Sequence, residues 1–145
     1  MSAEVVIANF LRIASQDLEG AKLLANANNR NAVYLCEQAA EKIIRAVLTS
    51  EGHHAGIKHQ LDQMVEDVPD ANPIKPLLEA IEHLAAFATA YRYPSPVGRI
   101  KATPPASDVT NYITDVEHAL NEAVSRFGVD LTKANTPAAM PGPIR

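Results

Sequence analysis

The stretch from Asn31 to Ser50 constrains the fold more than any other, because apolar residues recur at a helical period and cover most of its circumference. A helix on the surface of a globular protein needs an apolar stripe only about 100° wide. The stripe here is wider, so the sequence predicts a helix that packs on at least two sides. It is either the central helix of a bundle or a helix whose second face meets another subunit. The polar side chains are confined to one narrow stripe, made of Glu37, Gln38, Glu41, Lys42, Arg45 and Thr49.

Four further stretches carry apolar residues at helical spacing, and no stretch shows convincing period-two alternation. Prolines and glycines separate them: Pro69 follows the third predicted helix, Pro94 and Pro96 follow the fourth, and Gly128 is placed to cap the last. Short connections between neighbouring helices favour antiparallel packing. The sequence therefore predicts an all-α protein, an up-and-down antiparallel bundle of four to five helices. The additional predicted helices span residues 5–25, 57–68, 73–93 and 107–127.

The chain length predicts one domain. A chain of 145 residues is long enough for a single hydrophobic core and short for two. After about residue 130 the sequence is poor in large apolar residues and holds three prolines. We therefore predict a helical bundle over residues 1–128 and a flexible, proline-containing C-terminal tail over 129–145.

Charge and cysteine content limit the partners and the cellular compartment that the sequence predicts. The net charge of −4 means that binding to nucleic acid would need a local basic patch. The single cysteine, Cys36, excludes an intramolecular disulfide and is typical of the reducing cytoplasm. No apolar run approaches the roughly 18 residues of a membrane span. Glu4 stands where a signal peptide would carry positive charge. We expect a cytoplasmic protein without a membrane partner.

Three of the five histidines, His53, His54 and His59, fall within the turn "EGHHAGIKHQL". A zinc site needs three or four ligands that converge tetrahedrally. The turn offers no Cys, Asp or Glu after Glu51, and the spacing is not a recognised ligand pattern. We interpret the turn as a solvated connection between the second and third helices, with His59 bracing the start of the third. No metal site and no cofactor is predicted.

The loop "AYRYPSPVGRIK" is the second candidate site. No acidic residue occurs between Glu82 and Asp108, whereas Arg92, Arg99 and Lys101 do. Tyr91 and Tyr93 flank Arg92, and a guanidinium between two rings can bind a phosphate while the rings stack on a base. In the alternative interpretation, Arg92 pairs with a helix carboxylate and the tyrosines are half-buried bundle residues. Both interpretations stay open on sequence alone.

Four stretches, in order, resemble the HEPN domain family (higher eukaryotes and prokaryotes nucleotide-binding). The first is "DLEGAKLLANANNRNAVYLCEQAAEKIIRAVL", which is similar to the family's first two core helices. The others are "KHQL", "YRYP" and a last helix that begins near Ser107. Together they cover roughly residues 4–127. The resemblance implies a helical bundle, a homodimer, and a role in binding a nucleotide or RNA.

Many HEPN relatives are metal-independent ribonucleases, often toxins paired with a nucleotidyltransferase-like antitoxin, and the resemblance implies such a partner here as well. Their activity depends on an Arg-x(4–6)-His motif. Counting from Arg92, the histidine would fall at Val97, Gly98 or Arg99, and from Arg45 it would fall one residue or more before His53. The chain therefore resembles the non-catalytic branch, in which "RYP" replaces the motif, and no catalytic residue is predicted.

For this non-catalytic branch the resemblance implies a ligand pocket. Arg92, Tyr93, Lys58 and His59 are its predicted residues, and Arg45 and Lys42 would add phosphate contacts if the polar stripe of the second helix faces the pocket. Two other functions stay open. One is a ribonuclease toxin in which His53 serves Arg45, and the other is a structural module that docks a protein partner.

Overall fold

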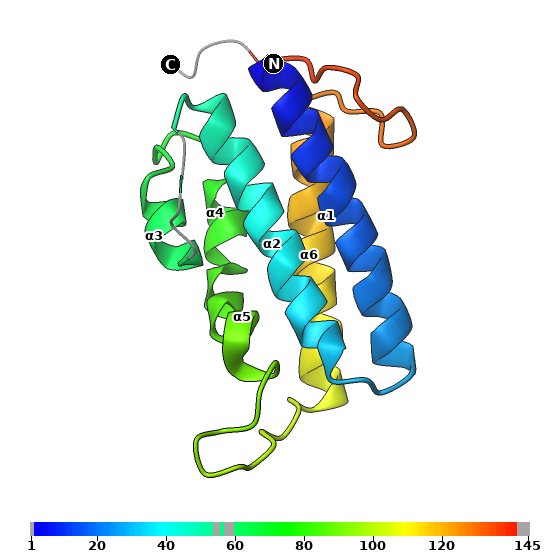
Figure 1. Ribbon diagram of the computed structural model, residues 1–145. Coiled ribbons are helices and arrows are strands. Elements are labelled where there is room, and N and C mark those ends of the chain that lie inside the picture. Colours follow the sequence, from blue (N-terminus) through cyan, green and yellow to red (C-terminus); the bar gives the residue numbers. More distant parts are fainter. Residues whose placement is uncertain (1, 54–55, 57–59, 142–145) are drawn as a thin grey trace.

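The computed structural model describes residues 2–53, 56 and 60–141, and all the regular structure within these ranges is helical (Figure 1). The three long helices are α1 (Ala3–Asn26), α2 (Asn31–Ser50) and α6 (Ala106–Arg126). Helix α1 runs down the bundle, α2 runs up, the short helices of residues 75–90 run down and α6 runs up, as an up-and-down arrangement requires (Figure 1). The predicted all-α helical bundle is confirmed. None of the helices in the described ranges is both long and apolar enough to cross a membrane.

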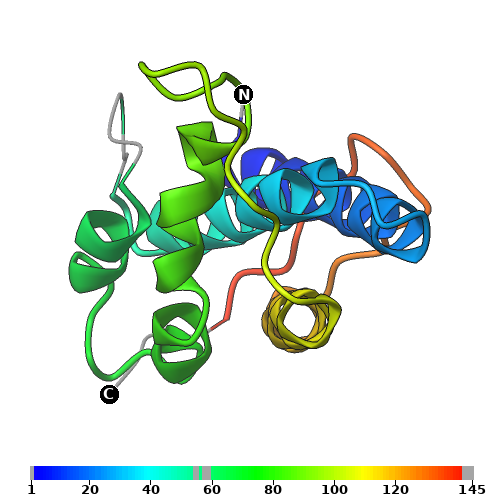
Figure 2. The ribbon, with the colours of Figure 1, turned by 90° about the horizontal axis from the view of Figure 1, so that it is seen from below.

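Helix α2 is the central helix. It contacts α1 along its length and also contacts α6. On the side opposite α1 it contacts three short helices, α3 (Leu61–Glu66), η1 (Glu82–Ala86) and α5 (Phe87–Ala90). The view along the bundle shows α2 between α1 and these short helices, with α6 below (Figure 2). Its apolar side chains, among them Ile43, Ile44 and Val47, are fully buried. The wide apolar face is thus covered within one chain, and it needs no second subunit.

The prediction of one continuous fourth helix over residues 73–93 is wrong. The structure divides it into α4 (Lys75–Glu79), a 3₁₀ segment η1 (Glu82–Ala86) and α5 (Phe87–Ala90). The large apolar residues Leu78, Ile81, Leu84 and Phe87 recur at every third position, and all four are buried. A 3₁₀ helix has three residues per turn, whereas an α-helix has about 3.6. A repeat of three residues therefore keeps these side chains on one face of a 3₁₀ helix, whereas on an α-helix the same repeat would shift gradually around the surface.

The segment after α6 lies along the start of α1. Arg12, which is 7% exposed, donates from Nε to the carbonyl of Asp130 over 3.1 Å and from its terminal nitrogens to the carbonyl and hydroxyl of Thr136 over 2.9 and 2.7 Å. The backbone N–H of Ala138 donates to the carbonyl of Glu4 over 2.9 Å. The described part of the segment expected as a loose tail therefore has defined contacts with the bundle. The domain boundary at residue 128 stays a prediction.

Candidate functional site

Two stretches without acidic residues meet at one end of the bundle. Residues 20–36 form the last turns of α1 and the start of α2, and residues 83–107 run from η1 through the long loop to the start of α6. Both connections lie at the lower end of the bundle in Figure 1. We call this region the basic end, defined by its cations Arg30, Arg92, Arg99 and Lys101. An acidic protein thus carries a local patch of positive charge of the kind that phosphate binding needs.

Arg92 lies against Tyr34 of α2. Its guanidinium is 4.7 Å from the centroid of the Tyr34 ring and donates a hydrogen bond to the Tyr34 hydroxyl. A guanidinium held over a ring keeps its charge, and most of its N–H donors stay available for a ligand. A carboxylate bound in the bidentate manner would occupy those donors. Tyr34 was missed in the sequence, although its spacing of four residues from Gln38 continues the polar stripe of α2.

Tyr91 and Tyr93 flank Arg92 in the sequence but differ in burial in the structure. Tyr91 is 4% exposed, packs against Phe87 with ring centroids 5.6 Å apart, and donates from its hydroxyl to the carbonyl of Ala102 over 3.2 Å. Tyr93 is 72% exposed. Tyr91 therefore belongs to the core, as the half-buried alternative anticipated, while Tyr93 is open to a ligand.

The loop beyond Tyr93 has an ordered turn. The N–H of Ser95 donates to the carbonyl of Arg99 over 2.8 Å, and the N–H of Arg99 donates to the Ser95 hydroxyl over 3.1 Å. The N–H of Gly98 donates to the carbonyl of Ser95 over 2.7 Å, and Gly98 has the positive φ of +79° that glycine adopts without strain. The turn leaves Val97 and Ile100 80% and 70% exposed.

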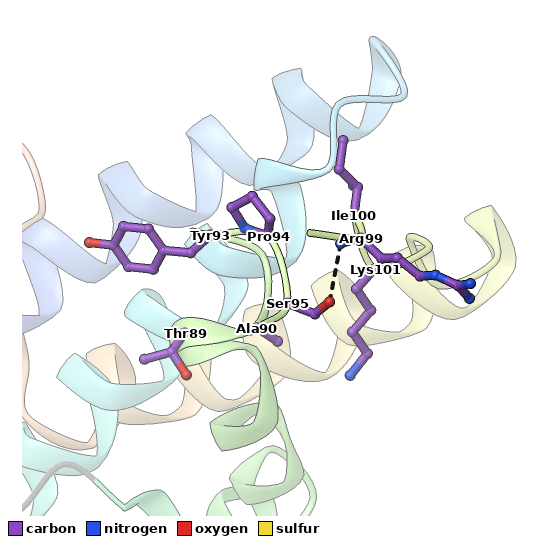
Figure 3. Close-up of a pocket in the computed structure, with 8 residues that line it drawn as sticks. All are labelled: Thr89, Ala90, Tyr93, Pro94, Ser95, Arg99, Ile100 and Lys101. Carbon is purple, nitrogen blue, oxygen red and sulfur yellow. Dashed lines mark hydrogen bonds between the residues drawn. The ribbon is translucent and has the colours of Figure 1, made fainter. Parts of the chain in front are cut away.

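Two open hollows adjoin this loop. The first has a volume of about 600 Å³, and Figure 3 shows its lining: Arg99 and Tyr93 extend to opposite sides of the loop, and Lys101 points away from Ile100. The second has a volume of about 510 Å³ and is lined by Tyr34, Arg92 and their neighbours on α2 and the loop. Tyr93 lines both hollows.

Glu37 is a buried carboxyl near Arg92. It is 1% exposed, and its polar contact is with the Gln38 side-chain amide, which donates to it over 2.7 Å. Burial, with a smaller contribution from Glu41, raises the pKa of Glu37 from 4.5 to about 7, although Gln38, Lys42 and Arg92 act to lower it. Periodicity placed Glu37 on the same polar stripe as Gln38, so its burial was not evident from the sequence.

Lys42 and Arg45 lie farther along α2 and are already engaged. The Lys42 ammonium is 2.6 Å from a carboxylate oxygen of Asp17 on α1. Arg45 is 3.5 Å from a carboxylate oxygen of Glu41 and donates to the carbonyl of Gly56 over 3.4 Å. At about 1.5 Å of rise per residue, Arg45 is roughly 16 Å along the helix from Tyr34. Arg45 therefore lies away from the basic end, whereas Lys42 lies between the two, close enough to Glu37 to lower its pKa as Arg92 does.

The histidine turn is described only in part. His53 is exposed, and its backbone N–H closes the end of α2 by donating to the carbonyl of Leu48 over 2.9 Å. His54 and the predicted pocket residues Lys58 and His59 lie outside the described residues. Within residues 2–53, 56 and 60–141, no group of three or more His, Cys, Asp or Glu side chains is arranged to hold a metal ion.

Comparison with known proteins gives one finding. The family model of the HEPN domain matches residues 7–133, which include all of the described helices apart from the first four residues of α1. Searches of curated proteins and of solved structures returned no match. The matched range also contains both hollows and all four cations of the basic end.

Proposed function

The chain belongs to the HEPN domain family, and from this premise we propose that it binds a nucleotide or RNA at the basic end without cleaving it. The observation that carries the proposal is the placement of Arg92 over Tyr34, beside a hollow that Tyr93 also lines. A guanidinium can hold a phosphate bidentately, and an exposed ring can stack on a base.

Charge supports this location over the others considered. Residues 20–36 and 83–107 contain no acidic side chain, whereas Lys42 and Arg45 each lie beside a carboxylate. A phosphate near those two residues would have to compete with Asp17 or Glu41. At the basic end, Arg92 contacts the ring and the hydroxyl of Tyr34. A phosphate displaces or shares these contacts at a lower free-energy cost than it would displace a carboxylate.

The proposal that the chain does not cleave RNA rests on the loop that follows Arg92. Val97, Gly98 and Arg99 occupy the positions where catalytic relatives carry a histidine. Neither Val97 nor Gly98 can transfer a proton, and a guanidinium is a hydrogen-bond donor without an acceptor site, so Arg99 does not serve as a general base. The loop thus offers cations and a ring for binding and no general base.

Arg92→Ala is expected to weaken binding of a nucleotide or a short RNA at least tenfold, because it removes a charged hydrogen-bond donor from the site. The measurement is a titration with adenine and guanine nucleotides and with a short single-stranded RNA at low salt. Lys133→Ala is the matched control, since it removes one positive charge from the segment after α6, which lies at the end of the bundle opposite the basic end (Figure 1). Equal loss in both variants, or no saturable binding by the unaltered chain at near-millimolar ligand, would contradict the proposal.

We also propose that the chain is a homodimer, as the family resemblance implies. Light scattering on the purified protein is expected to give twice the 15.6 kDa mass of one chain. Because α2 is covered within one chain, the interface would lie on another surface, and α1 leaves Ile13 and Leu23 46% and 67% exposed. A mass of one chain at micromolar concentration would contradict this part of the proposal. The nucleotidyltransferase-like partner stays a prediction.

A further inference from the structure

Tyr93 stands where the two hollows of the basic end adjoin. One hollow carries Arg92 and the other carries Arg99 and Lys101, so each has its own positive charge. The Tyr93 ring is 72% exposed and extends clear of the loop (Figure 3). A ring with so little protein against it leaves room for a flat ligand on its faces.

We propose that the ligand at this site is a single-stranded oligonucleotide, with one base stacked on Tyr93 and neighbouring nucleotides in the two hollows. The inference rests on the proposed function and specifies its ligand class. Arg92 holds a phosphate next to the stacked base, and Arg99 and Lys101 in the other hollow hold a phosphate farther along the strand. A mononucleotide engages only one of these two sets of cations.

A single strand fits this arrangement better than a duplex does. Bases within a duplex are stacked on one another and paired, so their faces are not accessible to a protein ring. Single-strand binding proteins combine a positively charged track with aromatic side chains on which bases stack. The basic end supplies both, with cations in each of the two hollows that Tyr93 lines.

The form of the loop supports binding without prior rearrangement. Three hydrogen bonds among Ser95, Gly98 and Arg99 fix the turn. Ile100, which is 70% exposed, and Pro94 add apolar surface to the lining of the first hollow. Apolar and aromatic surface beside cations suits the faces of bases and the phosphates between them.

An anionic lipid surface is the other partner that cations and exposed apolar side chains could fit. The hollows favour the oligonucleotide, because a recess with a cation beside an exposed ring suits a phosphate and a base, whereas a bilayer would engage the exposed Val97 and Ile100 and leave both recesses unfilled. The experiment therefore includes vesicles of phosphatidylserine and phosphatidylcholine as a competing arm.

The experiment measures the affinity of the full chain for AMP, a single-stranded RNA tetranucleotide, the same tetranucleotide with abasic sites, and an RNA hairpin duplex. The chain has four tyrosines and no tryptophan, so tyrosine emission gives a second readout of stacking. We expect the tetranucleotide to bind at least tenfold more tightly than AMP and than its abasic form. Tyr93→Ala should remove that gain, and Tyr93→Phe should retain it, because phenylalanine keeps the stacking surface.

The outcomes separate the inference from the function on which it rests. If AMP and the tetranucleotide bind equally well and Arg92→Ala weakens both, the inference is overturned and the proposed function stands. A duplex that binds as tightly as the single strand, or a Tyr93→Ala variant that keeps the tenfold gain, also overturns the inference. Binding to vesicles with no binding to any nucleotide or RNA overturns both.

Discussion

Replacing Arg12 with methionine is expected to lower the free energy of unfolding by about 3 kcal/mol. The guanidinium makes four hydrogen bonds of 2.7–3.1 Å, to Asn9, the carbonyls of Asp130 and Thr136, and the hydroxyl of Thr136. Hydrogen bonds to charged groups contribute roughly 1.5–3 kcal/mol each, and bonds to one group are not additive. Methionine keeps much of the apolar stem and removes every donor.

Urea unfolding of the Arg12→Met variant measures this effect, with Arg99→Met as the control. The Arg99 side chain is exposed, so its replacement should change the free energy of unfolding by less than about 0.5 kcal/mol. Trypsin gives a second readout, since release of the C-terminal segment should speed cleavage after Lys133 in Arg12→Met. Equal stability of the two variants, with unchanged cleavage, would show that Arg12 does not hold this segment.

Replacing Glu37 with glutamine is expected to change how stability depends on pH. Burial raises the pKa of Glu37 from 4.5 to about 7, so the folded state holds a proton that the unfolded state releases earlier. The stability that this carboxyl contributes is fully present below about pH 4.5 and is lost as the pH rises through 7. A shift of this size corresponds to about 3 kcal/mol. Glutamine has no proton to lose, so the variant should lack this decline.

Urea unfolding at pH 5 and pH 8 provides the test. The stability of Glu37→Gln relative to the unaltered protein should be more favourable at pH 8 than at pH 5, by roughly 2 to 3 kcal/mol. Glu19→Gln, at an exposed carboxyl on α1, serves as the control for the loss of one negative charge. A difference between Glu37→Gln and the unaltered protein that is the same at both pH values would show that Glu37 ionises as freely in the folded state as in the unfolded one.

Apolar periodicity predicted the long helices well because burial on one face is a property of a single helix. The predicted bounds of the second helix agree with α2, and the width of its apolar stripe correctly required packing on two sides. Of the two arrangements that the sequence left open, the structure shows the central helix. The fourth helix failed because an α-helical template was applied to Leu78, Ile81 and Leu84, whose three-residue spacing suits a tighter helix.

The candidate site was harder to predict, because its parts come from segments far apart in the chain. Arg92 was identified from the composition of its loop, but its partner Tyr34 lies 58 residues earlier. Tyr91 and Tyr93 are two positions apart and look equivalent in sequence, although one is in the core and the other is exposed. Periodicity assigns a face of a helix and does not say which other segment covers that face, which is why the burial of Glu37 was missed.

The uneven distribution of charge makes the protein an electric dipole. Negative side chains gather on α3, α4 and η1, where burial and the nearby Asp62, Glu79 and Glu66 raise the pKa of Glu82, while residues 20–36 and 83–107 have none. A polyanion approaching in solution would experience a torque that turns the basic end toward it before any contact forms. The rate of encounter, rather than the lifetime of a complex, should then respond most strongly to ionic strength.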